Sequence, residues 1–147
     1  MRHRFKLAGA IALAFVVARS LAQNSSASLR VIELTADKDS CYRMAGKVSP
    51  TIEVQPGEHL VLRITAIRAK QVARDGSIHG LALLDKNLDA VPGWRFYFHP
   101  GVQDVTVTAP EQPGRYTAVC TIICSDAHIG MKFTVLVADP RKVARSN

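Results

Sequence analysis

The sequence lacks an apolar run long enough to span a membrane as a helix. Its longest run, residues 7–18, stops at Arg19, whereas a spanning helix needs roughly 20 apolar residues. This run follows a basic start and leads to small residues ending at Ala22, which is the layout of a secretory signal. We therefore expect residues 1–22 to be a signal peptide, with an uncleaved anchor as the alternative. Export would place the protein in the periplasm or on the outer face of the cytoplasmic membrane.

A basic patch is also missing from the central part of the chain, although the formal net charge is +7. The excess of basic residues lies in residues 1–22 and 141–147, and residues 23–140 hold equal numbers of acidic and basic side chains. A nucleic-acid-binding domain would carry its basic residues as a patch on its folded surface. We therefore expect no nucleic acid partner, and we interpret residues 141–147 as a basic tail.

Several kinds of catalytic motif are absent as well. No Ser/His/Asp constellation, carboxylate pair or glycine-rich phosphate-binding loop stands out, so the sequence indicates no hydrolytic site. Internal repeats and low-complexity linkers are missing too, and 147 residues suffice for one domain with a short extension. Because 48% of the residues are apolar, we expect a packed core within a single domain at residues 23–140.

From residue 28 onward the chain contains a series of short β-type runs separated by Gly/Pro turns. These runs cover residues 28–35, 51–55, 59–67, 78–84, 94–98, 102–108, 115–120 and 131–137. We find no convincing amphipathic helix between them. About eight short strands at this spacing predict an all-β protein with a sandwich or barrel architecture.

Cysteine is scarce, with Cys41, Cys120 and Cys124 the only three in the chain. In an oxidising compartment the simplest expectation is one disulfide and one leftover thiol. However, two cysteines four residues apart on a tight loop are an unfavourable disulfide pair. Cys41 lies far from the other two in sequence, and a free or buried thiol is favoured there over a disulfide partner.

Two of these cysteines belong to the pattern C-x3-C-x3-H-x2-M, formed by Cys120, Cys124, His128 and Met131. The pattern lies in the connection between two predicted strands, so that its side chains can converge. Thiolate, thioether and imidazole together are a soft ligand set that favours copper over metals that prefer oxygen. A second imidazole would come from elsewhere in the chain, and His79 at the start of an earlier strand is the candidate.

This segment resembles the copper-binding loop of cytochrome c oxidase subunit II and of the CuA domain of nitrous oxide reductase. The resemblance implies a cupredoxin-like Greek-key β-sandwich with a binuclear CuA centre of two copper ions. In that family the two cysteines bridge the metals, and the two histidines cap the pair. The implied ligands are His79, Cys120, the backbone carbonyl of Ile122, Cys124, His128 and Met131.

The function implied by the resemblance is electron transfer. The protein would act as an electron carrier or as the electron-entry subunit of an oxidase-like complex, rather than as a catalyst alone. A c-type cytochrome or another redox protein would be its partner, with a membrane oxidase complex as one setting. Subunit II usually has Glu where this chain has Ile122, but the expected ligand there is a carbonyl, so the donor set is retained.

Other interpretations remain open on the residues alone. A mononuclear blue-copper site would use one cysteine, Cys124, with both histidines and Met131, which leaves Cys120 without a role. A structural zinc site would use both cysteines and both histidines, which leaves Met131 without a role. A periplasmic copper delivery or storage protein would use the same donors.

Four further residues have expected places. His59 begins a strand and His99 lies in a turn, so we expect both to be solvated rather than metal-bound. Trp94 is expected in the core or at its rim. Asp75 is a candidate hydrogen-bond partner for a ligand histidine.

Overall fold

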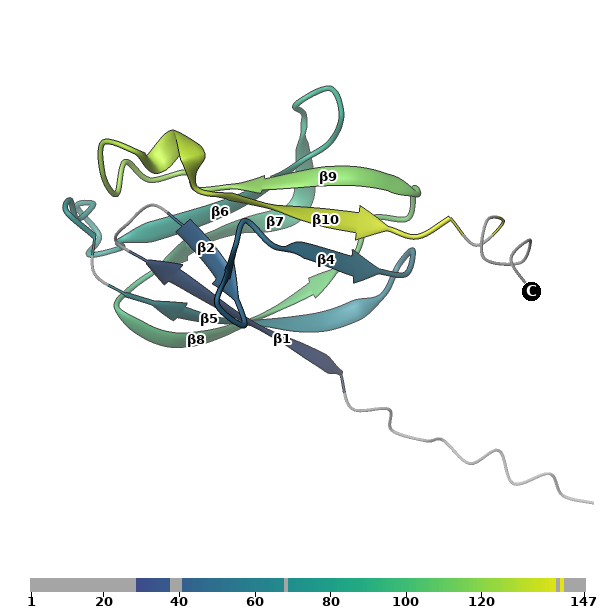
Figure 1. The fold of residues 1–147 in the computed structure, drawn as a ribbon, viewed down its shortest axis with the longest axis horizontal. Helices are drawn as coiled ribbons and strands as arrows, with labels where there is room; N and C mark the ends of the chain where they lie inside the picture. The colour runs from purple at the N-terminus through teal and green to yellow at the C-terminus, as the bar shows by residue number, and fades with distance from the viewer. Residues whose placement is uncertain (1–28, 38–40, 68, 140, 142–147) are drawn as a thin grey trace, which may run out of the picture.

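The computed structural model describes residues 29–37, 41–67, 69–139 and 141, which form a sandwich of two five-stranded sheets (Figure 1). The expected signal peptide and residues 142–147 of the expected tail lie outside these ranges. In order across the first sheet, the strands are β3 (Lys47–Val48), β2 (Cys41–Met44), β1 (Arg30–Asp37), β5 (His59–Ala66) and β8 (Gly101–Thr108). In order across the second sheet, they are β4 (Thr51–Val54), β10 (Lys132–Val137), β9 (Gly114–Val119), β6 (His79–Leu84) and β7 (Ala90–Phe98).

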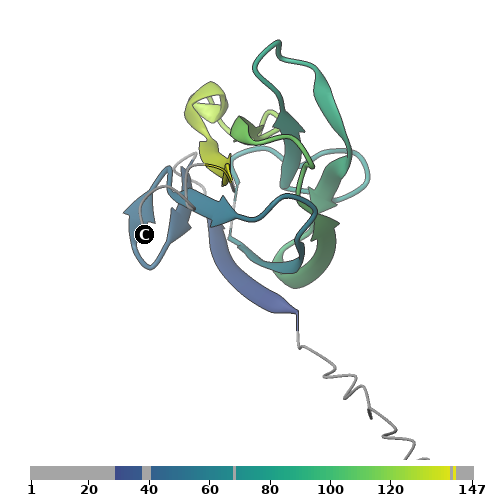
Figure 2. The same cartoon turned by 90° about the vertical axis from the view of Figure 1, so that its right-hand side faces the viewer.

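Both sheets are mixed. β1 pairs in parallel with β5, and β4 pairs in parallel with β10, whereas the neighbouring pairs β5–β8, β9–β10 and β6–β9 are antiparallel. A short 3-10 turn, η1 (His128–Gly130), precedes β10. Figure 2 looks roughly along the strands and shows the two sheets curving around the interior. Among the described residues, none of the helices has the length and apolar character that a membrane crossing requires.

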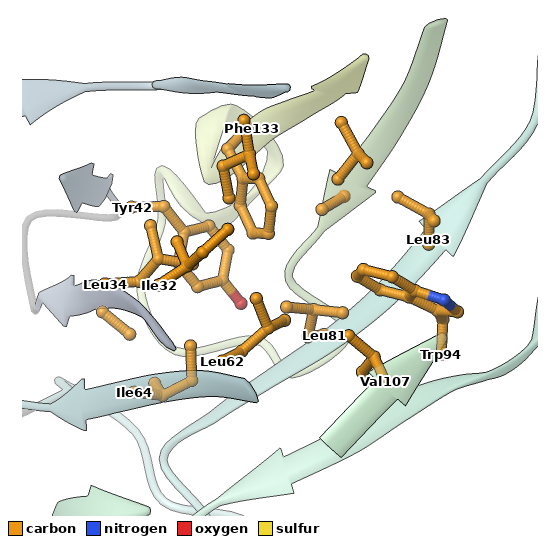
Figure 3. Packing of buried hydrophobic residues seen from close by; sticks show 14 of the residues in the cluster. Ile32, Leu34, Tyr42, Leu62, Ile64, Leu81, Leu83, Trp94, Val107 and Phe133 are labelled. Atoms are coloured by element: carbon orange, nitrogen blue, oxygen red, sulfur yellow. The ribbon is translucent and has the colours of Figure 1, made fainter. Parts of the chain in front are cut away.

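The core follows from the alternation of apolar residues along the strands. In β5, Leu60, Leu62 and Ile64 point inward while their neighbours are partly or fully exposed, as expected for a strand with one buried face. Figure 3 shows Leu62 and Ile64 from the first sheet packing toward side chains of the second. Trp94 lies in this core with 2% of its surface exposed, and its indole N–H donates to the Thr108 carbonyl at 2.7 Å.

The predicted all-β sandwich is confirmed, and each of the eight predicted runs overlaps a strand. Sequence reasoning missed β2 and β3, which form a hairpin through Ala45 and Gly46. Both turn residues have positive φ, 47° and 80°, as the tight hairpin turn requires. Ala-Gly is a weak signal for that turn, and a two-residue strand such as β3 has too few positions to show alternation.

β6 differs from the other strands because five of its six residues are buried. It lies between β9 and β7 within its sheet, and the chain that follows β9 covers its outer face at Gly80, where an added Cβ would meet Thr121 and Ile122. A strand covered on both faces is apolar throughout, which explains the sequence Gly-Leu-Ala-Leu-Leu after His79. His79 is therefore held at the start of a strand that is almost entirely buried.

Candidate metal centre

The cysteine-containing loop joins β9 to β10 at one end of the sandwich (Figure 1). The β9–β10 ladder reaches Val119 and Lys132, and the Cys120 amide then donates to the Met131 carbonyl at 3.0 Å. Cys120 and Met131 thus continue the ladder by one pair and form the two bases of the loop. Directly before β10, the Met131 amide also donates to the His128 carbonyl at 2.9 Å, and this bond closes η1.

Three sulfur atoms lie together beneath this loop. Cys120 Sγ is 3.9 Å from Cys124 Sγ, and Cys124 Sγ is 3.8 Å from Met131 Sδ. All three residues are buried, with 8% or less of each exposed. A disulfide would hold the two Sγ atoms at about 2.05 Å, and none of the three cysteines, all of them described, is disulfide-bonded. The simplest expectation from cysteine count, one disulfide, is therefore wrong.

The Ile122 carbonyl faces the same cluster. It accepts a hydrogen bond from the Cys124 amide at 2.7 Å, and the Cys120 thiol donates to it at 3.4 Å. The loop folds back on itself between its two cysteines, which aims this backbone oxygen at the sulfur atoms. The oxygen lies where a bound cation could reach it.

His79 completes the cluster from a distant part of the chain. Its side chain has no exposed surface, and Nε2 lies 2.8 Å from the Ile67 carbonyl. A carbonyl only accepts, so Nε2 carries the proton and Nδ1 keeps its lone pair. Nδ1 is buried and has no hydrogen-bond partner among the described residues. A ring nitrogen of His79 lies within 4.8 Å of the sulfur atoms of Cys120 and Cys124, and an imidazole with an unpaired acceptor beside two thiols fits a metal.

His128 is the one predicted ligand that lies outside the cluster of donor atoms in the structure. It is half-buried in η1, and its Nδ1 lies 3.2 Å from the Ser125 carbonyl. It is not one of the three residues whose ligand atoms cluster within 4.8 Å. The short turn holds the imidazole against its own backbone, whereas His79, Cys120, Ile122, Cys124 and Met131 are brought together.

Comparison with known proteins shows what kind of sandwich holds this cluster. No family model and no curated protein matches the sequence. Among solved structures, auracyanin A, a "blue" copper protein from the green thermophilic photosynthetic bacterium Chloroflexus aurantiacus, is 16% identical. The match covers 76% of this chain and all of that chain, with a TM-score of 0.53. Rusticyanin from Thiobacillus ferrooxidans is 18% identical over 76% of this chain and 79% of its own, with a TM-score of 0.50.

The chain has the cupredoxin fold. It also resembles a chain of a heme-copper terminal oxidase dimer, with 19% identity, a TM-score of 0.52 and 74% of this chain covered. The match spans 65% of that oxidase chain, so the whole oxidase chain is considerably longer than the shared part. At these identities the likeness is one of fold, and the chemistry has to be argued from the residues of this chain.

The segment after β5 contacts both parts of the cluster. Its Ile67 carbonyl holds His79, and a few residues later the amides of Lys70 and Gln71 donate to the Cys124 carbonyl at 2.9 and 3.3 Å. The Lys70 ammonium also lies 3.3 Å from the Asp126 carboxylate. One short segment therefore contacts both the strand histidine and the cysteine loop, which fixes their separation.

Gly80 permits the close approach of the loop to β6. A Cβ built on Gly80 would collide with Thr121 Oγ1 and would lie 3.4 Å from both Ile122 Cγ1 and the Phe96 carbonyl oxygen. Any larger residue would push away the chain between the two cysteines. The absence of a side chain at this position is therefore part of the site.

The two thiols differ in acidity. Burial by itself raises the pKa of Cys120, but the adjacent His79 imidazole and the backbone of Gly80 and Ile122 outweigh burial and hold this pKa below its ordinary value of 9.0. Burial, together with the neighbouring charge of Cys120, raises the pKa of Cys124 to about 11. Cys120 is thus the first thiolate, and a cation between the sulfur atoms would favour ionisation of both.

Tyr42 is the neighbour that sequence reasoning missed. Its hydroxyl donates to the carbonyl of Gly80, the residue after His79. Burial raises the pKa of Tyr42 well above the usual value, and the charges of Cys120 and Cys124 add to the effect. It lies in the Cys-Tyr-Arg-Met run of β2, where only the tyrosine is buried, and four residues are too few to show an alternating pattern in the sequence.

The other candidate residues lie away from the centre. His59 and His99 are exposed, as predicted. The suggestion that Asp75 supports a ligand histidine is wrong, because its carboxylate accepts from the amide and hydroxyl of Ser77 at 3.0 and 2.5 Å. The backbone carbonyl of Ile67 takes that role for His79 instead.

Proposed function

We propose that this cupredoxin is a copper-binding electron-transfer protein with a binuclear centre of the CuA type. The observation that carries the proposal is the pair of buried thiols, with sulfur atoms 3.9 Å apart and the unpaired Nδ1 of His79 beside them. The proposed ligands are His79, Cys120, the Ile122 carbonyl, Cys124, His128 and Met131.

The chemistry of the donors supports copper. Two thiols, a thioether and a neutral imidazole are soft ligands, which select copper over metals that prefer oxygen. A mononuclear blue-copper site would use one cysteine and leave the other as a bystander, but Cys120 and Cys124 here share one buried cluster. A zinc site would leave Met131 unused, although its sulfur lies against Cys124.

Bound copper would supply one-electron redox chemistry, and the role of the chain is to hold the donors fixed. Cys120 and Met131 are anchored by the β9–β10 ladder, and His79 by β6 and the Ile67 carbonyl. Donors on strands move little when charge changes, which suits fast electron transfer. His128 would complete the set once its Nδ1 leaves the Ser125 carbonyl.

The surface around the loop suits contact with a redox partner. His128 is half-exposed, and Ile123 and Ile129 of the same loop are 59% and 83% exposed. Exposed apolar residues in a group mark interaction sites. The proposed partner is a c-type cytochrome or another redox protein met outside the cytoplasm. The fold-level likeness to a heme-copper oxidase chain supports an oxidase complex as one setting.

The test is to load the purified protein with copper, count the metal and record its visible and paramagnetic-resonance spectra. We expect two coppers per chain and hyperfine splitting from two equivalent nuclei. Cys120→Ser and Cys124→Ser should each abolish that signal, whereas Cys41→Ser, a matched control at a cysteine outside the donor cluster, should leave it unchanged.

Other results would redirect the proposal. One copper with a blue mononuclear spectrum would place the protein with auracyanin A in its chemistry as well as in its fold. Weakly held Cu(I) that passes to an acceptor protein would indicate copper delivery or storage. Failure to bind copper, with stable zinc binding instead, would refute electron transfer.

A further inference from the structure

The Tyr42 side chain extends from the first sheet to the strand of the second sheet that contains His79. It belongs to β2 in the first sheet, has no exposed surface, and donates its hydroxyl to the Gly80 carbonyl of β6 in the second sheet at 2.5 Å. Its ring packs edge-on against Phe133, with centroids 5.1 Å apart and planes at 81°. Figure 3 shows the ring beside Phe133 within the core, with the hydroxyl directed inward.

The Gly80 carbonyl needs a donor at this point. The β6–β9 ladder begins at Ala82 and Val119, so Gly80 lies beyond the last pair, where β9 has already turned into the cysteine loop. A buried carbonyl without a partner costs about 1–3 kcal/mol. The Tyr42 hydroxyl takes the place of the missing strand partner, in the opening between β6 and the loop.

Gly80 is also the residue through which β6 meets the centre. It directly follows His79, and a Cβ built on it would collide with Thr121, the residue next to Cys120. A shift of Gly80 therefore displaces His79 and the Cys120 environment together. The position of Gly80 depends in turn on Tyr42.

We propose that Tyr42 is a positioning residue of the metal centre: its hydroxyl, bonded to the Gly80 carbonyl across the sandwich, sets how the His79 strand lies against the Cys120–Cys124 loop. The inference rests on the proposed copper function and extends it to a residue that touches no metal. Its geometry suits this role because a phenol ring has only two side-chain torsions, and here both are restricted by burial and by Phe133.

The test compares Tyr42→Phe with Tyr116→Phe in the full chain. Tyr116 also donates its hydroxyl to a backbone carbonyl, that of Gln112 at 2.9 Å, but it lies in β9 away from the cysteine loop. We expect Y42F to weaken copper binding about tenfold in a chelator competition and to alter the visible and paramagnetic-resonance spectra. We expect Y116F to change neither. In the copper-free protein, Y42F should also shift the amide nitrogen resonance of Leu81, whose peptide group contains the Gly80 carbonyl.

The outcomes separate the two proposals. A wild-type protein that binds no copper refutes the proposed function and this inference with it. A wild-type protein that binds copper, with a Y42F variant of lower Tm but unchanged affinity and spectrum, overturns the inference alone. Should Y42F fail to fold, 4-aminophenylalanine at position 42 keeps a donor, and 4-methylphenylalanine keeps only the size. Near wild-type copper affinity with 4-aminophenylalanine and a tenfold loss with 4-methylphenylalanine would support the inference. Equal copper affinity of the two variants would overturn it.

Discussion

Replacing Gly80 with alanine should damage the protein where β6 meets the cysteine loop. The new Cβ would collide with Thr121 Oγ1 and would lie at close contact distance, 3.4 Å, from a side-chain carbon of Ile122 and from the Phe96 carbonyl oxygen. Thr121 cannot easily turn away, because a β-branched side chain carries a second heavy atom into the vacated space. The loop segment between the two cysteines must therefore move.

The magnitude follows from two opposing effects. Overpacking at a tightly packed position costs about 1–3 kcal/mol. The backbone of Gly80 is not in the left-handed region, so alanine can adopt it, and the loss of chain freedom in the unfolded state favours Gly80→Ala by about 0.4–1 kcal/mol. We expect a net destabilisation of about 1–2 kcal/mol, measured by urea unfolding of the copper-free protein.

A double-variant cycle tests the cause. Thr121 is exposed, so T121A alone should change stability by less than about 0.5 kcal/mol. Since T121A removes the atom that the Cβ meets, G80A/T121A should recover about 1 kcal/mol of the loss, and the same pair should recover the copper spectrum. If G80A is as stable as the wild type, or if T121A does not rescue it, the close approach at Gly80 does not shape the site.

Three further predictions concern single residues. His79→Ala removes the unpaired buried Nδ1 and should lower the copper-to-protein ratio measured after loading, whereas a full complement would exclude His79 as a ligand. Partial burial by itself raises the pKa of Glu58, but its bonds to Arg30 and to the Gln55 amide hold that pKa below the ordinary 4.5. The resulting stability is present above about pH 4.5 and is lost as the pH falls through the lowered pKa. E58Q should therefore flatten the acid side of a plot of Tm against pH, and an unchanged slope would contradict this. Trp94→Phe removes the donor to the Thr108 carbonyl and leaves unfilled volume in the core, so it should destabilise the protein by about 2 kcal/mol in urea unfolding. A loss of less than about 0.5 kcal/mol would contradict this.

Strands with several alternating positions were predictable, and the shortest were not. β5 and β10 have a buried residue at every second position, and this pattern is visible in the sequence because the pleat itself has a period of two. β2 has four residues and β3 has two. Their pairing is determined by the register against β1 and by the turn, and neither is encoded in a repeating pattern. Sequence reasoning consequently missed Tyr42.

The chemical character of the site was determined by the sequence alone. Cys120, Cys124 and Met131 lie within one loop between two strands, and the β9–β10 ladder brings the ends of such a loop together. Their identity as soft donors does not depend on how the rest of the chain folds. His79 was predictable only as a candidate, because nothing in its local sequence states how far it lies from that loop.

Tertiary structure decided which donors meet and what holds them. The packing of β6 under the loop places His79 near the sulfur atoms, and the Ile67 carbonyl selects the tautomer that leaves Nδ1 available. The Tyr42 hydroxyl reaches Gly80 from the other sheet, and the Ser125 carbonyl keeps His128 apart. These contacts join residues of different strands or depend on side-chain rotation. These contacts form only when the two sheets pack together, so they cannot be predicted from the spacing of residues along the chain.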